Sequence, residues 1–162
     1  RQDPMIRKLT ASAFVLALLA GPLHGAESIL TPVEVEANEM EIVDVDKQAI
    51  FRGNVDAVRG SQKIRSDVMT VFYADVKQPD GTSKSQASKL DAKGNVTITT
   101  TKQVITGEWA KMDILANTLL VGGRVKLIEG KNTLQGEKLT VDLTTERTLM
   151  SGGRVKGSFV PK

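Results

Sequence analysis

The stretch LLVGGRVKLIEGKNTLQGEKLTVDL, residues 119–143, decides the fold class of this chain. Its apolar start is interrupted at Gly122-Gly123. From Arg124 onward apolar and polar side chains alternate on either side of a Gly130-Lys131-Asn132 turn. A period of two is typical of β-strands that bury one face and expose the other. Paired glycines and a Gly-Lys-Asn cluster favour bulges or turns between strands. The stretch therefore predicts consecutive strands of a β-sheet.

The central element of this stretch recurs along the chain. Four copies of a Gly-x-Val element lie at steps of 41, 29 and 30 residues: Gly53-Asn54-Val55, Gly94-Asn95-Val96, Gly123-Arg124-Val125 and Gly153-Arg154-Val155. A second landmark keeps the same offsets, because Gly136 follows Gly107 by 29 residues and Ser66 precedes Gly107 by 41. The repeat is therefore about 30 residues long, with one insertion in the first interval. One such unit cannot bury its apolar face alone, so the sequence predicts stacked β-strand repeats.

The composition fits one β-domain without a strong overall charge. A chain of 162 residues is long enough for a core, and its aromatic content is only 4%. Three of its 22 basic residues and one of its 19 acidic residues precede residue 27, which leaves 19 and 18. This near balance gives no electrostatic reason to expect a nucleic-acid partner.

The residue types needed for common catalytic sites are missing from most of the chain. There is no cysteine, and the single histidine is His24. Ser-His and Cys-His nucleophiles and the usual zinc sites are therefore not expected. No phosphate-binding loop follows the paired glycines, so we predict no cofactor, no metal and no enzyme. A sugar-active β-solenoid enzyme with paired carboxylates remains the alternative, although no pair stands out.

Residues 1–26 have the layout of a secretory signal peptide. Arg7-Lys8 precede an apolar run, Leu9–Leu23, which is shorter than the ~20 residues that span a bilayer. Residues 1–4 come before Met5 and form a possible upstream extension. We predict an exported single domain, residues 27–162. A retained anchor helix, as in a membrane-anchored inner-membrane component, is the alternative.

Superposing the repeats aligns apolar positions into rows across successive strands. Val71, Met112 and Val141 share one row, and Tyr73, Ile114 and Leu143 share the next. These rows predict a continuous apolar interior that either packs as a core or opens as a groove. Trp109 falls on the opposite register and is not assigned to the interior. The extra residues between Ala74 and Ser88, around Pro79-Asp80-Gly81, predict a surface loop.

Several of these segments carry a specific resemblance. The runs PVEVEA (32–37), AIFRGNV (49–55) and IRSD (64–67), with GEWAKM (107–112) and GEKL (136–139), resemble the OstA-like lipopolysaccharide-transport family. The resemblance covers residues 29–162 and implies an all-β fold, an open, twisted antiparallel β-jelly roll. It also implies a periplasmic protein whose apolar inside carries the acyl chains of lipopolysaccharide. Head-to-tail protomers would connect an inner-membrane ATP-driven exporter complex with an outer-membrane translocon.

The resemblance and the rows together name candidate lipid-binding residues. By resemblance, lipid contacts are expected at Val33, Val35, Ile98, Ile114 and Ala116. The rows extend this lining to Phe51, Val55, Val71, Tyr73, Val96, Met112, Val125, Leu127, Val141 and Leu143. The alternative for each residue is an ordinary place in a closed core.

Charge differs between the two ends of the predicted domain. From Glu27 to Asp46 every charged residue is acidic, whereas the last sixteen residues contain Arg147, Arg154, Lys156 and Lys162 with one acid. We expect the acidic end of one protomer to face the basic end of the next. A structural filament that does not bind lipid is a further alternative, and two solvated ends would carry the same charges.

Overall fold

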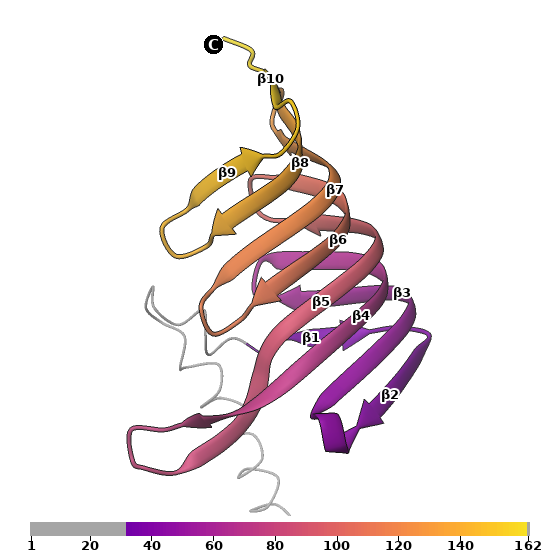
Figure 1. The fold of residues 1–162 in the computed structure, drawn as a ribbon, viewed down its shortest axis with the longest axis vertical. Helices are drawn as coiled ribbons and strands as arrows, with labels where there is room; N and C mark the ends of the chain where they lie inside the picture. The colour runs from indigo at the N-terminus through magenta and orange to yellow at the C-terminus, as the bar shows by residue number, and fades with distance from the viewer. Residues whose placement is uncertain (1–31, 162) are drawn as a thin grey trace, which may run out of the picture. The chain divides into compact units, whose positions relative to one another are not determined.

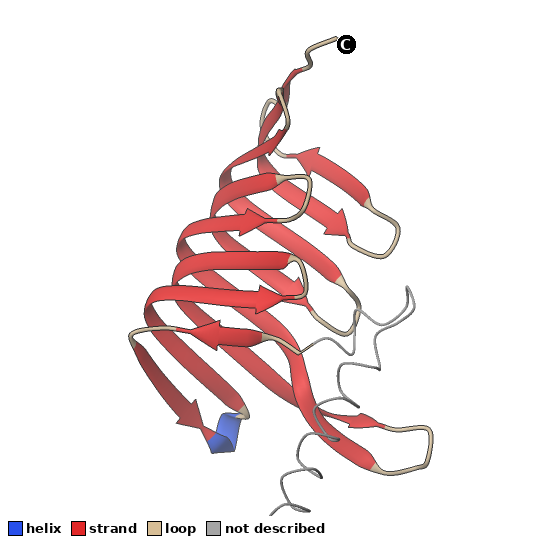
Figure 2. Ribbon diagram, turned by 180° about the vertical axis from the view of Figure 1, so that it is seen from behind, coloured by secondary structure: helices blue, strands red, loops and turns tan. Residues whose placement is uncertain are grey.

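The computed structural model describes residues 32–161, and within them one antiparallel sheet contains ten strands (Figures 1 and 2). The strands are β1 (Glu34–Glu36), β2 (Glu39–Val43), β3 (Gln48–Arg59), β4 (Gln62–Lys77), β5 (Ser83–Thr99), β6 (Val104–Asp113), β7 (Thr118–Glu129), β8 (Asn132–Asp142), β9 (Arg147–Ser151) and β10 (Lys156–Ser158). A short 3-10 helix, Asp44–Asp46, joins β2 to β3. The predicted signal peptide, residues 1–26, lies outside the described residues. In the part of the chain that is described, no helix is long and apolar enough to cross a membrane.

The long strands each belong to two half-sheets. The path of the sheet is β1-β3-β4-β5-β6-β7-β8-β10, and β2 and β9 are added to β3 and β8. β2 pairs with the first half of β3 and β1 with its second half. At the other end β9 and β10 divide β8 in the same way. We name half-sheet A the part that runs from β2 to β9, and half-sheet B the part that runs from β1 to β10.

The two half-sheets are joined at bulges that coincide with the sequence repeat. At three corners a glycine and its successor have positive φ: 83° and 48° at Gly53-Asn54, 84° and 49° at Gly94-Asn95, and 82° and 48° at Gly123-Arg124. The strand register shifts at the same places in β3, β5 and β7. Glycine adopts this left-handed region without the steric cost that a Cβ brings. We call this row of bulges the spine.

The fourth corner lies one residue earlier than the repeat predicted. Gly152 and Gly153 have φ of 85° and 63°, so Gly152 is the equivalent of Gly123 and follows it by 29 residues. The predicted alignment on Gly153-Arg154-Val155 is therefore wrong by one position. The corner requires two consecutive left-handed residues, and the glycine pair supplies both. Val155 is left 42% exposed instead of entering the core.

Small residues oppose each corner on the neighbouring strand. Ser66, Gly107 and Gly136 pair with the valine that follows each left-handed pair. A Cβ added to Gly107 would lie 2.6 Å from the Val121 Cγ1 atom and 3.0 Å from the Gly122 carbonyl oxygen. The second landmark of the repeat therefore marks close packing of neighbouring strands at the spine.

The register of the strands confirms one of the predicted rows. Val71 pairs with Leu90, Leu90 with Met112, Met112 with Leu119, and Leu119 with Val141, as these cross-strand pairs show:. The row crosses half-sheet A, and its side chains face the interior. Trp109 lies on the other face, where its ring covers Gly122. Its predicted place outside the interior is correct.

The insertion between the first two repeats is a hairpin rather than a loop. β4 continues to Lys77 and β5 begins at Ser83, so only the tip of the predicted surface loop is irregular. At the tip the Asp80 Oδ1 atom accepts hydrogen bonds from the Thr82 hydroxyl (2.6 Å) and amide (3.0 Å). These bonds hold the pKa of Asp80 below its usual value. The alternating Lys, Ser and Gln of this segment are compatible with an exposed two-stranded ribbon.

Candidate functional site

The apolar side chains of the two half-sheets face one another and form a single cluster. Residues of every long strand contribute, among them the fully buried Val55, Met69, Leu90, Ile98 and Leu139. Val33 and Val35 of the N-terminal segment pack against the same cluster. The candidate site is this interior, because it is where the predicted lining residues converge.

The structure brings most of the predicted lining together. Ten predicted residues are buried in the cluster: Phe51, Val55, Val71, Val96, Ile98, Met112, Ile114, Val125, Leu127 and Val141. Val33, Val35 and Leu143 are partly buried against it. Their contact with lipid stays a prediction, but their common location in one interior is established by packing.

Tyr73 does not share the burial of its row. Its amide donates to the Lys47 carbonyl oxygen as the Ile114 amide donates to that of Ser88, so the two positions are equivalent. Tyr73 is nevertheless 40% exposed and Ile114 only 3%. Its strand runs on into the exposed hairpin, and the first repeat beside it ends in the exposed turn at Asp44–Asp46. Fewer neighbours therefore cover Tyr73, and the prediction that it lies in the interior is wrong.

Ala116 is also placed outside the interior. It is exposed in the turn between β6 and β7, where its amide donates to the Asp113 Oδ1 atom at 2.9 Å. The alternation that carries Met112 and Ile114 inward ends at this turn. Ala116 is therefore a rim residue of the site and not part of its lining.

The two half-sheets approach each other again at the edge away from the spine. Here the turns of half-sheet A at 114–117 and 143–146 face the turns of half-sheet B at 60–61 and 100–103. We call this edge the seam. A hollow of about 400 Å³ lies along it, lined from half-sheet B by residues such as Ser61 and Lys102 and from half-sheet A by residues such as Thr144 and Glu146.

A buried arginine crosses the seam. Arg59, at the end of β3, is only 6% exposed, and its guanidinium donates to the Asn117 Oδ1 atom at 3.2 Å. It also lies 3.8 Å from the Met112 sulfur. The Asn117 Nδ2 atom donates in turn to the Thr144 hydroxyl at 3.1 Å. One side chain of half-sheet B is thus connected to two turns of half-sheet A.

Sequence reasoning missed Arg59 and Asn117. Burial lowers the pKa of the Arg59 guanidinium, because a charge is disfavoured away from water. The signal was available in the alternation, since Arg59 follows Val55 and Ala57 at steps of two and must therefore face inward. A charged residue in phase with an apolar stripe marks a place where an interior requires a polar contact.

The interior is tightly filled in this conformation. A hollow between Val33, Arg59 and Ile64 of half-sheet B and Leu90 and Met112 of half-sheet A measures about 10 Å³. This is roughly the space that a single water molecule needs. The apolar cluster is therefore closed along this part of the seam.

The interior is less closed at the N-terminal end of the sheet. Met40 and Ile42 of β2 pair with the buried Phe51 and Ala49, so they share the inward face. They are nevertheless 59% and 56% exposed, because no strand covers them from the far side. At the opposite end Phe159 is 71% exposed. Both ends of the sheet therefore present apolar side chains next to unpaired strand edges.

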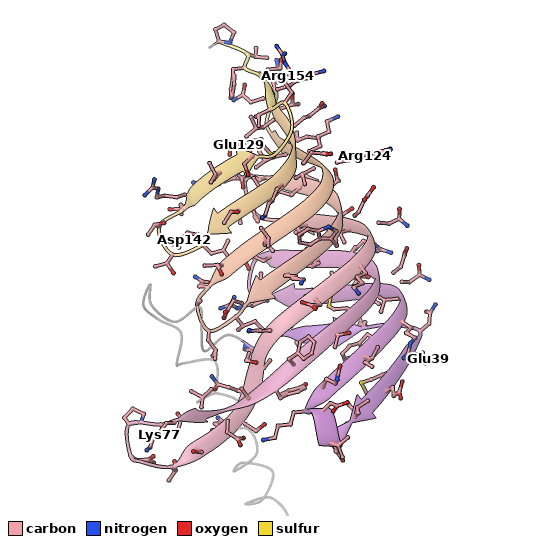
Figure 3. All side chains as sticks on the ribbon, viewed as in Figure 1. Glu39, Lys77, Arg124, Glu129, Asp142 and Arg154 are labelled. Carbon is pink, nitrogen blue, oxygen red and sulfur yellow. The ribbon has the colours of Figure 1, made fainter. Side chains whose placement is uncertain are left out.

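The charges at the two ends have opposite signs. Figure 3 shows Glu39 and Arg154 at opposite ends of the described domain. Near the acidic end, Arg52 forms ion pairs with Glu39 (3.2 Å) and Glu41 (2.9 Å), which offset part of the charge. At the basic end a hollow of about 570 Å³ is lined by the cations Arg124, Lys126, Arg154 and Lys156 and by one acid, Glu137. The predicted asymmetry of charge is present in the structure.

The described residues show no arrangement suited to metal chemistry. Among residues 32–161, no group of three or more His, Cys, Asp or Glu side chains could hold a metal ion. The chemistry that the site offers is apolar burial with a few polar contacts at its seam.

Comparison with known proteins follows from this geometry. The family LptA/(LptD N-terminal domain) LPS transport protein matches residues 34–147, which is most of the chain. The chain belongs to this family. The match extends from β1 to the start of β9 and so includes both half-sheets and three corners of the spine. The family transports lipopolysaccharide, which is a non-enzymatic role.

Individual relatives agree with this assignment. An uncharacterised protein of Rhizobium meliloti is 29% identical over 95% of this chain and 85% of its own length. The "Lipopolysaccharide export system protein LptH" of Pseudomonas aeruginosa is 28% identical over 97% of this chain and 86% of its own. A crystal structure of LptH, described as the LptA homologous periplasmic component of the lipopolysaccharide transport device, has a TM-score of 0.70. It covers 83% of this chain and 99% of the solved chain at 18% identity, and it confirms the predicted β-jelly roll.

Proposed function

We propose that this protein is a periplasmic lipopolysaccharide carrier that bridges the inner and outer membranes. The observation that carries the proposal is the facing of two apolar half-sheets within the matched residues 34–147. An amphiphile with several acyl chains fits such an interior, because each buried CH₂ contributes roughly 0.8 kcal/mol. The headgroup of the lipid would stay outside the seam in water.

The proposed carrier does no covalent chemistry of its own. Directional transport then requires energy from a partner, and we propose the inner-membrane ATP-driven exporter complex as its source. An outer-membrane translocon would receive the lipid. Export of the mature chain by a signal peptide at residues 1–26 belongs to the same proposal.

The lipid-contacting residues of the proposal are those nearest the seam and the N-terminal end. Val33 and Val35 are partly buried there and pack against the cluster. Ile98 and Ile114 are buried on half-sheets B and A, respectively. Tyr73, although outside the closed interior, faces the mouth of the site and would contact lipid only at its rim.

A pair of adjacent photoreactive substitutions tests the carrier function. Phe51 is 8% exposed and faces the interior, whereas Ile50 faces the opposite side of the same strand. Benzoylphenylalanine at position 51 replaces an aromatic side chain and keeps much of its shape; the same group at position 50 is the matched control. Expressed in its native cell envelope, the variant at 51 should form lipopolysaccharide adducts and the variant at 50 should not. Equal labelling, or none in folded and exported protein, would contradict a lipid-binding interior.

We further propose that protomers associate head to tail. β1 and β2 at one end and β9 and β10 at the other have unpaired edges, which are templates for strand addition. Exposed Met40 and Ile42 would then be covered by the next protomer, and the apolar interior would continue across the junction. Opposite charges at the two ends favour this orientation over its alternatives.

Sedimentation at several salt concentrations tests this association. If complementary charge directs it, raising ionic strength should reduce the mass of the assemblies, since exposed charges are screened within about 10 Å at 0.1 M salt. The Lys156→Glu variant should assemble poorly, whereas Lys84→Glu, on the exposed hairpin, should not. Assembly that is indifferent to salt and to Lys156→Glu would contradict the charge-directed orientation.

A further inference from the structure

A closed interior and a cargo of acyl chains require a change of conformation. The space between the half-sheets near Arg59 measures about 10 Å³, and the apolar side chains around it are buried. Close-packed interiors do not admit a chain of methylenes without moving the walls. The half-sheets must therefore separate somewhere before the interior can accept an acyl chain.

The spine is poorly suited to be the place of separation. Each corner there is continuous backbone with ladder hydrogen bonds on both sides of the bulge. At the seam, by contrast, the half-sheets are connected by side chains. The two polar contacts that cross it are Arg59 to Asn117 at 3.2 Å and Lys102 to Glu146 at 4.0 Å. Opening the seam breaks no backbone pairing.

Of these two contacts, only the first is buried. Lys102 and Glu146 are 72% and 80% exposed in their side chains, so water competes for their charges. Arg59 and Asn117 are each 6% exposed and lie directly over the apolar cluster. Asn117 is also held in place by its bond to Thr144, and its carbonyl oxygen accepts from the Leu143 amide at 2.9 Å. The contact therefore ties half-sheet B to two neighbouring turns of half-sheet A.

We propose that the Arg59–Asn117 hydrogen bond is a latch that holds the seam closed in the lipid-free protein and breaks when acyl chains enter. The inference rests on the proposed lipopolysaccharide-carrying function and specifies how that site is loaded. Entry is lateral, through the seam between the turns at 60–61 and 114–117. The spine acts as the hinge, and its glycine corners keep the two half-sheets joined while the seam opens.

A covalent lock across the seam tests the route of entry. The chain has no cysteine, so Ser61→Cys with Thr144→Cys allows a short bismaleimide to join half-sheet B to half-sheet A. The matched control is Ser61→Cys with Thr100→Cys, which joins two turns of half-sheet B. Both pairs line the same hollow, so only the first prevents separation. Binding of labelled lipopolysaccharide is measured for each protein before and after cross-linking.

The outcomes separate the latch from the carrier function. We expect the lock to reduce binding at least tenfold and the control cross-link to change it less than twofold. Full binding by the locked protein would overturn lateral entry while leaving the carrier function intact. Absence of binding in both uncrosslinked proteins would overturn the proposed function, and the latch with it.

A pair of asparagine substitutions tests the latch itself. Asn117 and Asn95 both have positive φ (59° and 49°) and both side chains form hydrogen bonds, but one lies at the seam and the other at the spine. Asn117→Gly keeps the backbone conformation accessible and removes the latch, so lipid should load at least threefold faster. Asn95→Gly should leave the loading rate within a factor of 1.5, because it does not cross the seam. Equal loading rates for Asn117→Gly and the unaltered chain would overturn the latch, since a more populated open state must load faster.

Discussion

The spine and the seam are two edges of the same pair of half-sheets, yet they are built differently. At the spine, left-handed glycines let each long strand pass from one half-sheet to the other without losing its neighbours. At the seam, the half-sheets meet through side chains of turns, with one buried polar contact at Arg59 and one exposed ion pair at Lys102. The repeat therefore fixes the two half-sheets at one edge and leaves the other edge able to separate. This asymmetry is what a closed apolar interior needs if it is to accept and release a lipid.

The largest effect is expected from a side chain added at the spine. Gly107→Ala should lower the free energy of unfolding by about 2–3 kcal/mol, because its Cβ would lie 2.6 Å from the Val121 Cγ1 atom and 3.0 Å from the Gly122 carbonyl oxygen. Gly130→Ala at a seam turn is the matched control. It meets nothing within 4 Å and should cost only about 1 kcal/mol, from its φ of 60°. Urea unfolding measures both, and equal losses would contradict close packing at the spine.

A smaller loss is expected when the buried contact of the seam is removed. Asn117→Gly takes an acceptor from the buried Arg59 guanidinium and should cost about 1.5 kcal/mol of unfolding free energy. Asn95→Gly removes an exposed bond to Asp67 and should cost about 0.5 kcal/mol. Thermal unfolding at matched pH compares the two variants. A larger loss for Asn95→Gly would show that the seam contact contributes little to the closed state.

The exposed ion pair of the seam should matter less than either of these. Lys102→Ala removes the 4.0 Å contact with Glu146 and should change the unfolding free energy by less than about 0.5 kcal/mol. The change should shrink further in high salt, because the side chains are exposed. If Lys102→Ala destabilised the protein as much as Asn117→Gly, the seam would be held by surface charge instead of the buried latch.

The smallest effect concerns the hairpin tip, which belongs to neither edge. Hydrogen bonds from Thr82 hold the pKa of Asp80 below its unfolded value, so they stabilise the fold above that unfolded pKa, near 4. This contribution is lost as the pH falls through the folded pKa. Asp80→Asn should therefore be slightly less stable than the unaltered chain at pH 7, and the difference should disappear at strongly acidic pH. A difference that persisted there would contradict the assigned cause.

Most of the architecture could be predicted because the repeat and the alternation are local signals. The glycine spacing located three corners and the row of Val71, Met112 and Val141 without further information. The fourth corner was misplaced because Gly152-Gly153 offers two choices to a spacing argument, and only backbone conformation distinguishes them. Tyr73 was misassigned because alternation predicts which face a side chain takes, but not whether neighbouring strands cover it.

The polar contact of the seam could be predicted only in part. The phase of Arg59 with Val55 and Ala57 indicated an inward guanidinium. No sequence pattern pointed to Asn117 as its acceptor, because the two residues are 58 positions apart and meet through the folding of the half-sheets. The position of Arg59 follows from local periodicity, but its pairing depends on the tertiary fold.

The central claim is that lipid lies between half-sheets that stay joined at the spine and part at the seam. Spin labels at Ser61→Cys and Thr144→Cys, on opposite sides of the seam, report this separation by double electron–electron resonance. A second pair at Ser61→Cys and Thr100→Cys reports half-sheet B alone. Saturating lipopolysaccharide should lengthen and broaden the first distance and leave the second unchanged. Bound lipopolysaccharide with no change in the first distance would contradict the account.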